Sequence, residues 1–367
     1  MKIGVLTSSR ADYGIYLPLL QKLKEHSFFK LEIIAFGTHL SRGHGYTLST
    51  IENDGYEIIH TISSLLSNDD EQSISSSYGI TVMKFADFWQ NHHYNIVLCL
   101  GDRFEMSAAV QAGIPFGVSF AHLHGGETTL GAIDNVYRHQ ISLASQFHFT
   151  ATEVFSEKLT NLLGSSDGIY TVGSLSLNDV KTFVPIAKDT FYDTFSIPDE
   201  AFALVTFHPE TMAAQENIQF AQAMKKALTT ISEGLFVVIT MPNADTQGSI
   251  YRDALLQLKN ENENRTLLIE NFGKVNYFSA MHHCKLLIGN TSSGILEAAS
   301  FGKYVVNVGD RQKGRAQSEN IINCAFTEID IIKATNKVNN LDSYIGENVY
   351  FKENVSKNII KILKESI

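Results

Sequence analysis

The chain has 367 residues, a formal net charge of −10, and 44% hydrophobic and 19% charged residues. This length exceeds what one hydrophobic core usually supports, so two domains of a soluble globular protein are expected. The acidic balance disfavours nucleic acid as a partner, because nucleic-acid binding requires a basic face. A small anionic ligand remains compatible, since a few arginines make a locally positive site.

Targeting and redox features predict a cytoplasmic protein without a membrane partner. The N-terminal MKIGVLTSSR lacks the apolar stretch of a signal peptide, and no segment approaches the ~20 apolar residues of a membrane span. The cysteines have no metal-ligand spacing and are expected to be buried free thiols of a reducing compartment. They are Cys99, Cys284 and Cys324.

Short apolar or β-branched runs alternate with longer helical patterns along the chain. In the first half the expected strands cover residues 2–7, 31–37, 95–101, 116–122 and 147–152. In the second half they cover 202–208, 235–241, 265–270, 285–289 and 304–309. Continuous apolar strands separated by helices are typical of parallel sheets covered on both faces. Two such sets predict an α/β protein with two doubly wound, Rossmann-like domains.

The domain boundary is expected near residues 170–180, where a strand ends in small polar residues. We predict a first domain at 1–172 and a second, nucleotide-binding domain at 173–349. The segment 350–367 is predicted to form an amphipathic helix that packs back on the first domain. Its apolar stripe consists of Ile359, Ile360 and Leu363.

Two polar clusters follow strands of the first half, and ligands of open α/β sheets bind beyond such strand ends. TSSRADYG places Arg10 at a strand-to-helix junction, where an arginine clamps a phosphate or simply lies on the surface. GDRFEM places Asp102 and Arg103 directly after a very apolar strand, a position that favours function. A structural Asp–Arg ion pair is the alternative for this second cluster.

The segment AHLHGGETTLGAIDNVYRH, residues 121–139, concentrates histidines and carboxylates around two glycines. His-x-His at a strand end favours a metal, but no further ligand set is visible, so we predict none. Acid–base chemistry fits better, because histidine and carboxylate exchange protons near neutral pH. A structural role remains open for each histidine taken singly. The cluster consists of His122, His124, Glu127, Asp134 and His139.

Polar loops also follow strands of the second half. TFHPET ends a strand at His208, and MPNADTQG, residues 241–248, is another strand-end loop. GDRQKGR is either a set of cations beside a phosphate site or a solvated basic loop. Its cations are Arg311, Lys313 and Arg315.

GNTSSGILEAAS, residues 289–300, leads from an apolar run into a segment with a helical pattern. A helix N-terminus has unpaired N–H groups and a partial positive charge, which suit a phosphate. The small hydroxyls of Thr291 and Ser292 add donors there, although simple N-capping is the alternative. Glu297 suits ribose hydroxyls or a solvated helix position.

The chain resembles the hydrolysing UDP-N-acetylglucosamine 2-epimerases of bacterial sialic acid synthesis. The motifs that carry the resemblance occur in this order: SRADYG, LGDRFE, HLHGGE…GAIDNVYRH, FHPET, PNAD, GNTSSGILEA and GDRQKGR. Each motif alone is weak, but the ordered set is specific and spans residues 3–315. The resemblance implies a fold of the glycosyltransferase-B type with the site between the domains.

The resemblance also implies a reaction. UDP-N-acetylglucosamine and water give N-acetylmannosamine and UDP, through elimination to 2-acetamidoglucal and hydration with inversion at C2. The scheme needs no metal or cofactor, and its product serves sialic acid and hence capsule or surface polysaccharide. Relatives form homo-oligomers, so a dimer or tetramer is expected.

Carried over by motif, the binding residues divide by the part of the ligand they contact. The diphosphate is held by Arg10, Thr291, Ser292 and Arg311. The nucleoside lies near Glu297, which takes the ribose, near Asn243, and near the loop at Phe272.

The resemblance also implies that Arg103 and His208 line the part of the site where the sugar reacts. Non-hydrolysing relatives have a carboxylate where His124 stands, so the group that removes the C2 proton stays open. The carboxylates expected to move protons are Asp102, Glu127 and Asp134.

Three alternatives remain from the sequence. The same reaction on UDP-2,4-diacetamido-2,4,6-trideoxyglucose, toward legionaminic acid, would use nearly all of these motifs. A glycosyltransferase of the same fold would need an acceptor site and leaves the acid–base cluster unexplained. A non-catalytic nucleotide-sugar sensor would have no use for Asp102, Glu127 and His208 together.

Overall fold

The computed structural model describes residues 1–367 apart from 42–45, 69, 131–132, 243–246 and 367. The chain forms two compact units. The N-terminal unit consists of Met1–Glu127, Ile133–Lys181 and Tyr350–Ile367. The C-terminal unit consists of Thr128–Ala132 and Thr182–Val349. That the second unit binds the nucleotide stays a prediction.

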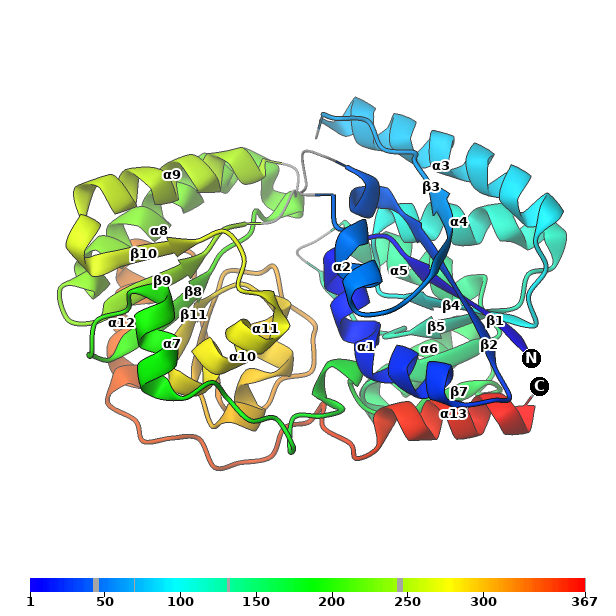
Figure 1. Cartoon of the computed structure of the whole chain (residues 1–367). Helices are drawn as coiled ribbons and strands as arrows, with labels where there is room; N and C mark the ends of the chain where they lie inside the picture. Colours follow the sequence, from blue (N-terminus) through cyan, green and yellow to red (C-terminus); the bar gives the residue numbers. More distant parts are fainter. Residues whose placement is uncertain (42–45, 69, 131–132, 243–246, 367) are drawn as a thin grey trace. The chain divides into compact units, whose positions relative to one another are not determined.

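The N-terminal unit contains a parallel sheet with the strand order β3-β2-β1-β4-β5-β6-β7 (Figure 1). Its strands are β1 Lys2–Thr7, β2 Lys30–Phe36, β3 Ile58–Ile62, β4 Ile96–Leu100, β5 Phe120–Leu123, β6 Phe147–Thr150 and β7 Ile169–Thr171. Its helices are α1 Arg10–Glu25, α2 Leu48–Asn53, α3 Glu71–Asn91, α4 Phe104–Gly113, α5 Asp134–Leu143, α6 Glu153–Leu163 and α13 Val355–Ser366.

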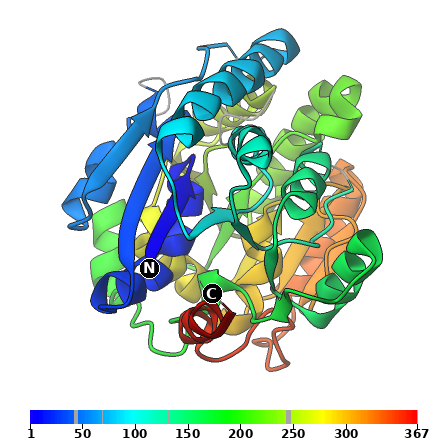
Figure 2. The ribbon, with the colours of Figure 1, turned by 90° about the vertical axis from the view of Figure 1, so that its right-hand side faces the viewer.

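Helices cover both faces of this sheet, because its interior strands are apolar on both faces. Along β4, Ile96 and Leu98 pack in the core beneath α1 and α13, while Val97 and Cys99 pack beneath α3 and α4. The terminal helix α13 lies against α1 (Figure 2). Its apolar stripe is buried.

The C-terminal unit contains a second parallel sheet with the order β10-β9-β8-β11-β12-β13. Its strands are β8 Phe202–Thr206, β9 Phe236–Thr240, β10 Thr266–Ile269, β11 Leu286–Gly289, β12 Val305–Val308 and β13 Ile321–Cys324. Its helices are α7 Lys188–Phe195, α8 Asn217–Ser232, α9 Gly248–Glu261, α10 Gly273–His283, α11 Ser292–Leu296 and α12 Glu328–Asn339. A core between the sheet and α8, α9 and α12 stabilises this unit.

The prediction of two doubly wound parallel sheets is confirmed. One expected strand was placed wrongly: residues 114–116 form a short 3-10 helix, Gly117 has a φ of +64°, and β5 begins only at Phe120. Cys99 and Cys284 are buried as expected, whereas Cys324 is partly exposed.

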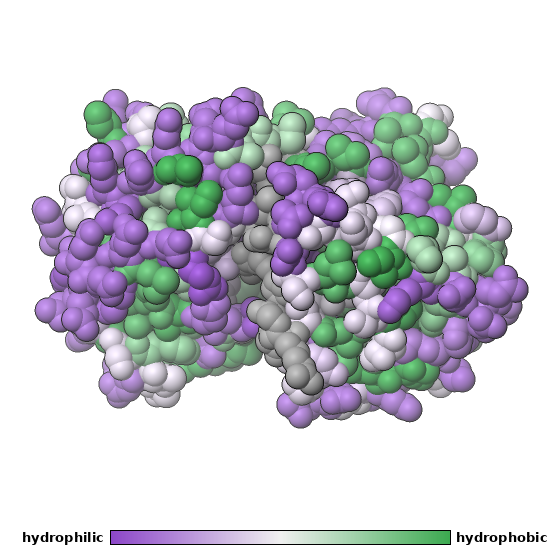
Figure 3. Space-filling model, turned by 90° about the horizontal axis from the view of Figure 1, so that it is seen from above, coloured by the Kyte–Doolittle hydropathy of each residue, from purple (hydrophilic) through white to green (hydrophobic). Residues whose placement is uncertain are grey.

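Hydrophilic residues cover much of the face drawn in Figure 3. On the face drawn in Figure 3, hydrophobic residues form small separate groups among hydrophilic ones. Among the described helices, none is both long enough and apolar enough to cross a membrane.

Candidate functional site

Each sheet has one position where the strand order reverses direction. In the N-terminal unit this switch point lies between β1 and β4. Arg10 follows β1 directly, and Asp102 and Arg103 follow β4. Crevices at the carboxyl ends of the two strands at a switch point are where doubly wound sheets bind ligands.

In the C-terminal unit the switch point lies between β8 and β11. His208 follows β8, and Thr291 and Ser292 follow β11. The structure therefore brings the predicted residues of each unit to that unit's own switch point.

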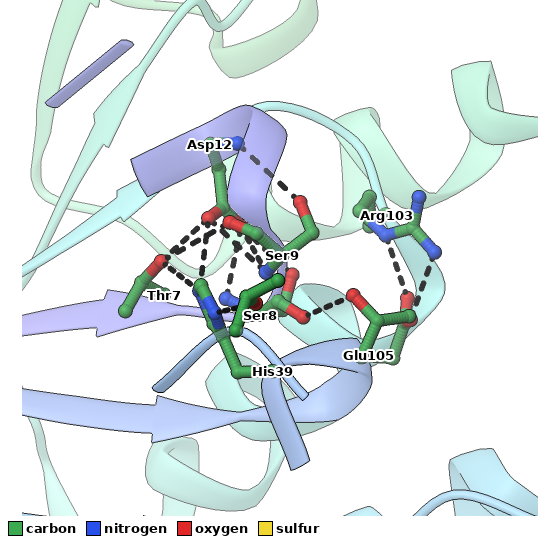
Figure 4. A network of polar contacts seen from close by, with 9 residues as sticks. Thr7, Ser8, Ser9, Asp12, His39, Arg103 and Glu105 are labelled. Carbon is green, nitrogen blue, oxygen red and sulfur yellow. Dashed lines mark hydrogen bonds and ion pairs between the residues drawn. The ribbon is translucent and has the colours of Figure 1, made fainter. Parts of the chain in front are cut away.

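The turn between β1 and α1 is organised by one buried carboxylate (Figure 4). Asp12 accepts hydrogen bonds from the Ser8 amide at 2.9 Å, the Ser8 hydroxyl at 2.8 Å and the Thr7 hydroxyl at 2.5 Å. It also accepts from the Ser9 amide at 3.2 Å and is 5% exposed. Since Asp12 takes the amides of this turn, an anion here would be held by the side chain of Arg10, which is exposed.

A second segment fixes the same turn from the side of β2. Nε2 of the buried His39 lies 2.9 Å from the Thr7 hydroxyl, and its Nδ1 lies 2.7 Å from the Thr47 hydroxyl. Burial lowers the pKa of His39, partly offset by the charge of Asp12. The turn that carries Arg10 is thus rigidly held.

Asp102 and Arg103 pair with different partners, so the alternative of an ion pair between them is wrong. Asp102 accepts a hydrogen bond from the buried guanidinium of Arg138. Arg103 donates to both oxygens of Glu105, at 3.2 and 2.9 Å. The Asp102 side chain keeps 25% of its surface exposed, which suits a group that meets a ligand.

His124 and Glu127 form a buried pair in the turn that follows β5. Nδ1 of His124 lies 2.7 Å from Oε1 of Glu127. Arg138 donates to the His124 carbonyl at 2.7 Å and lies 3.9 Å from Oε2 of Glu127. One arginine thus connects both of these residues with Asp102.

His122 has a structural environment instead. Its Nδ1 lies 2.9 Å from the Ser142 hydroxyl and its Nε2 lies 2.8 Å from the Gly101 carbonyl oxygen. Burial holds the pKa of His122 well below its ordinary value.

Two further residues of the cluster lie on α5. Burial lowers the pKa of His139, whose Nε2 lies 3.4 Å from the side-chain amide of Asn135. Asp134 is the first residue of α5 and is partly exposed.

Asn290 ties the two strands at the C-terminal switch point together. Its side chain accepts from the His208 amide at 2.7 Å and donates to the His208 carbonyl at 2.8 Å. Thr291 caps α11, accepting from the Ser293 amide at 3.4 Å. His208 is thereby held beside the turn that carries Ser292.

The basic loop after β12 is fixed by Glu210. Its Oε1 accepts from the amides of Asp310 at 2.8 Å and Arg311 at 3.2 Å. Burial raises the pKa of Glu210. The side chains of Arg311 and Gln312 donate to the Asn290 carbonyl, at 3.3 and 2.8 Å. The structure therefore places Arg311 next to the β11–α11 turn, as the sequence predicted for a cation near this turn.

Two other predicted binding residues, Glu297 and Phe272, have partners within the protein. The helix expected after Ser292 has only five residues, so Glu297 is its C-cap, and the Ser293 hydroxyl donates to the Glu297 carboxylate. The ring of Phe272 is buried against Phe195, with centroids 4.8 Å apart. Asn243 lies outside the described residues.

Sequence reasoning missed the residues that hold the predicted ones in place. They are Asp12, His39, Arg138, Glu210 and Asn290. Four of them, Asp12, Arg138, Glu210 and Asn290, stand inside the quoted motifs, which were the available signal, whereas His39 lies outside those motifs. Among the described residues, no group of three or more histidine, cysteine, aspartate or glutamate side chains is arranged to hold a metal ion.

A family model described as UDP-N-acetylglucosamine 2-epimerase matches residues 21–364. The chain belongs to this family. The match covers most of both units.

Two relatives and one solved structure illustrate the range of this family. A UDP-N,N'-diacetylbacillosamine 2-epimerase (hydrolyzing) of Legionella pneumophila is 31% identical over 99% of this chain and 95% of its own. The polysialic acid biosynthesis protein P7 of Escherichia coli is 29% identical over 100% and 94%. The structure of a Neisseria meningitidis UDP-GlcNAc 2-epimerase bound to UDP-GlcNAc superposes on this chain with a TM-score of 0.81. The match covers 100% of each chain at 17% sequence identity. This similarity shows the fold, which is of the glycosyltransferase-B type.

Proposed function

We propose that this protein is a hydrolysing 2-epimerase that converts UDP-N-acetylglucosamine and water into N-acetylmannosamine and UDP. A base removes the C2 proton as UDP leaves, which gives 2-acetamidoglucal. Water then adds to C1, and a proton returns to C2 on the other face. No metal or cofactor takes part in this scheme.

The observation that carries the proposal is the acid–base cluster at the N-terminal switch point, in a chain of this family. Asp102, His124 and Glu127 are all connected by Arg138. A buried cation organises them into one proton-transfer centre, which is what removal and return of a proton at carbon require. Asp134 is proposed to belong to the same centre.

The proposed ligand contacts follow the motifs. Arg10, Thr291, Ser292 and Arg311 hold the diphosphate and stabilise the charge that develops on departing UDP. The nucleoside is proposed to lie near Glu297, Asn243 and Phe272, and the reacting end near Arg103 and His208.

Two rival functions explain less of the structure. A glycosyltransferase would use the nucleotide-binding groups but leaves the buried His124–Glu127 pair without a task. A nucleotide-sugar sensor has no need of an acid–base centre organised by Arg138. Both rivals predict that no free epimerised sugar is formed.

The second candidate substrate is UDP-N,N'-diacetylbacillosamine, which is the 2,4-diacetamido-2,4,6-trideoxy sugar. The name of the Legionella pneumophila relative, at 31% identity, favours this substrate. The name of the Escherichia coli relative, at 29% identity, favours a place in sialic acid and surface polysaccharide synthesis. Both substrates undergo the same elimination and hydration.

The deciding experiment incubates the protein with each UDP-sugar in deuterated water, without an acceptor, and identifies products by NMR. We expect UDP and the C2-epimerised free sugar, with deuterium at C2, and a higher kcat/KM for the true substrate. Unepimerised sugar, or retention of the original hydrogen at C2, would contradict the proposal.

The proposal also includes a cytoplasmic location and a homo-oligomeric state, either a dimer or a tetramer.

A further inference from the structure

The backbone of His124 is held in an unusual conformation. Its φ is +63°, in the left-handed region that non-glycine residues rarely adopt. Its amide donates to the Phe149 carbonyl at 2.9 Å, and its own carbonyl accepts from Arg138 at 2.7 Å. The next turn needs glycine, since a Cβ on Gly126 would lie 2.4 Å from the Phe155 carbonyl oxygen. Such over-determined strain persists chiefly at functional sites.

The ring of His124 presents one unused nitrogen. Because an ionised carboxylate only accepts hydrogen bonds, the contact of Nδ1 with Glu127 places the ring proton on Nδ1. Nε2 then carries a bare lone pair. This nitrogen is buried and has no hydrogen-bond partner in the part of the chain that the structure describes. The whole His124 residue is 6% exposed.

A buried polar atom without a partner needs an explanation, and an absent ligand is one of the few available. His122, two residues earlier, shows the contrast: both of its ring nitrogens have partners within the protein. Buried ring nitrogens without a partner among the described residues also occur in His139 and His148, so the assignment of His124 rests equally on its backbone conformation and on its contact with Glu127.

We infer that Nε2 of His124 removes the C2 proton of the substrate and that Glu127 is a positioning residue. This inference rests on the proposed function and assigns the group that removes the C2 proton. The C2–H electron pair forms the C1=C2 bond, the C1–O bond breaks, and its electrons leave with UDP. The proton stays on Nε2, and Glu127 stabilises the resulting imidazolium, as the carboxylate of a catalytic triad does.

Glu127 itself is poorly placed to carry the proton. It is 1% exposed, its Oε1 is engaged by His124, and its Oε2 faces Arg138. A carboxylate held between a ring N–H and a guanidinium is a weak base, because both neighbours favour its charged form. The proton therefore goes to the ring rather than to the carboxylate.

The test uses His124→Asn and His124→Gly, because asparagine and glycine both tolerate a positive φ and keep the turn intact. We expect kcat to fall by roughly two to four orders of magnitude, the usual share of general base catalysis. UDP affinity, measured by calorimetry, should change less than about threefold by the same reasoning. Added imidazole should restore part of the turnover of His124→Gly. The exposed His93→Asn serves as the matched control and should keep full activity.

Supplying 2-acetamidoglucal separates the two half-reactions. Because His124 is assigned to elimination, His124→Asn should still hydrate the glucal while it fails on the UDP-sugar. Adding Glu127→Gln to His124→Asn should cost little further activity, since a positioning residue has nothing left to position.

The outcomes distinguish this inference from the proposed function. If the wild-type chain epimerises neither UDP-sugar, the proposed function fails and the inference with it. If the wild type is active and His124→Asn keeps near-normal turnover, or if the two substitutions lower the rate multiplicatively, the inference alone is overturned. Rescue by imidazole together with intact glucal hydration supports it.

Discussion

The β1–α1 turn and the β11–α11 turn both follow a strand at a switch point, and both carry residues predicted to hold a diphosphate. In the first, Asp12 takes the amides of Ser8 and Ser9. In the second, the cap is the Thr291 hydroxyl, which accepts from the Ser293 amide at a long 3.4 Å. The amides of the first turn are satisfied by a carboxylate of that turn, whereas the cap of the second turn makes a single long hydrogen bond.

This difference changes what each turn offers an anion. At the first turn only the arginine side chain remains, and the network around it acts as a rigid mount for Arg10. At the second, α11 has five residues and a correspondingly small dipole, so the predicted contacts are the hydroxyls and Arg311 rather than a long helix end. Side-chain substitutions in the first turn should therefore change stability, and substitutions of the hydroxyl side chains in the second turn should change binding, whereas its backbone glycine should matter for stability.

The largest effect on stability is expected from Gly289→Ala, which disturbs the backbone of the second turn. Gly289 has a φ of +142°, and a Cβ there would lie 1.8 Å from the Thr206 carbonyl oxygen of the neighbouring strand. We expect a loss of at least about 4 kcal/mol in the stability of the C-terminal unit, because β8 and β11 must separate locally. Far-UV circular dichroism during urea unfolding would measure it.

Gly14→Ala is the control, since nothing lies within 4 Å of its added Cβ in α1. It should stabilise by roughly 0.5–1 kcal/mol, the usual gain of alanine over glycine in a helix. Equal losses for both substitutions would contradict the close approach at Gly289.

Asp12→Ala should give the second largest effect, on the N-terminal unit. It leaves the amides and hydroxyls around a buried position without their acceptor, which costs roughly 2–4 kcal/mol. Trp89, the only tryptophan in the sequence, is buried in this unit and reports its unfolding by fluorescence. If Asp12→Ala unfolds at the wild-type urea concentration, the first turn does not depend on its carboxylate.

The sequence predicted the interior of both sheets but not all of their edges. Interior strands such as Ile96–Leu100 are buried on both faces, so they are continuously apolar and easy to find. The strands β3 and β13 lie at sheet edges, and their partly exposed, polar-containing segments lack that signal. For the edge strand β7, only its end near residue 170 was expected.

The site was predictable in the same uneven way. Strand-end positions of Arg10, Asp102 and Ser292 follow from the alternation of strands and helices. The pairing of Asp102 with Arg138 could not be predicted in this way, because Arg138 lies 36 residues away on another element and no local pattern joins the two residues. Glu210 and the amide of Asp310, 100 residues apart, illustrate the same limit.

Ser292→Ala should weaken binding rather than folding. Losing one hydroxyl bond to a charged diphosphate costs roughly 1.5–3 kcal/mol, which corresponds to about ten- to a hundredfold in UDP affinity and a similar rise in KM. Calorimetry with UDP measures the first and steady-state kinetics the second. The change in stability should stay within about 0.5 kcal/mol, as for other surface substitutions.

Ser9→Ala is the same substitution in the first turn. Ser9 caps α1 and completes its capping box with Asp12, so its loss should cost about 1 kcal/mol of stability. UDP affinity should stay within about threefold, because the Ser9 hydroxyl serves the helix rather than the ligand. If Ser9→Ala weakened UDP binding as much as Ser292→Ala, the two turns would not differ in the way described.

The smallest effect concerns pH and again divides the two turns. Burial lowers the pKa of His39, so its folded value lies below the ordinary 6.5 of the unfolded chain. As the pH falls below 6.5, the unfolded chain binds a proton that the folded N-terminal unit resists, and the stability of this unit decreases. Above that pH the contribution is complete. His39→Gln should therefore reduce the dependence of the urea midpoint on pH between 7.5 and 5, followed by Trp89 fluorescence. His148→Gln should reduce it more, because burial lowers the pKa of His148 to about 4. An unchanged dependence in His39→Gln would mean that this histidine is not what makes the first turn sensitive to acid.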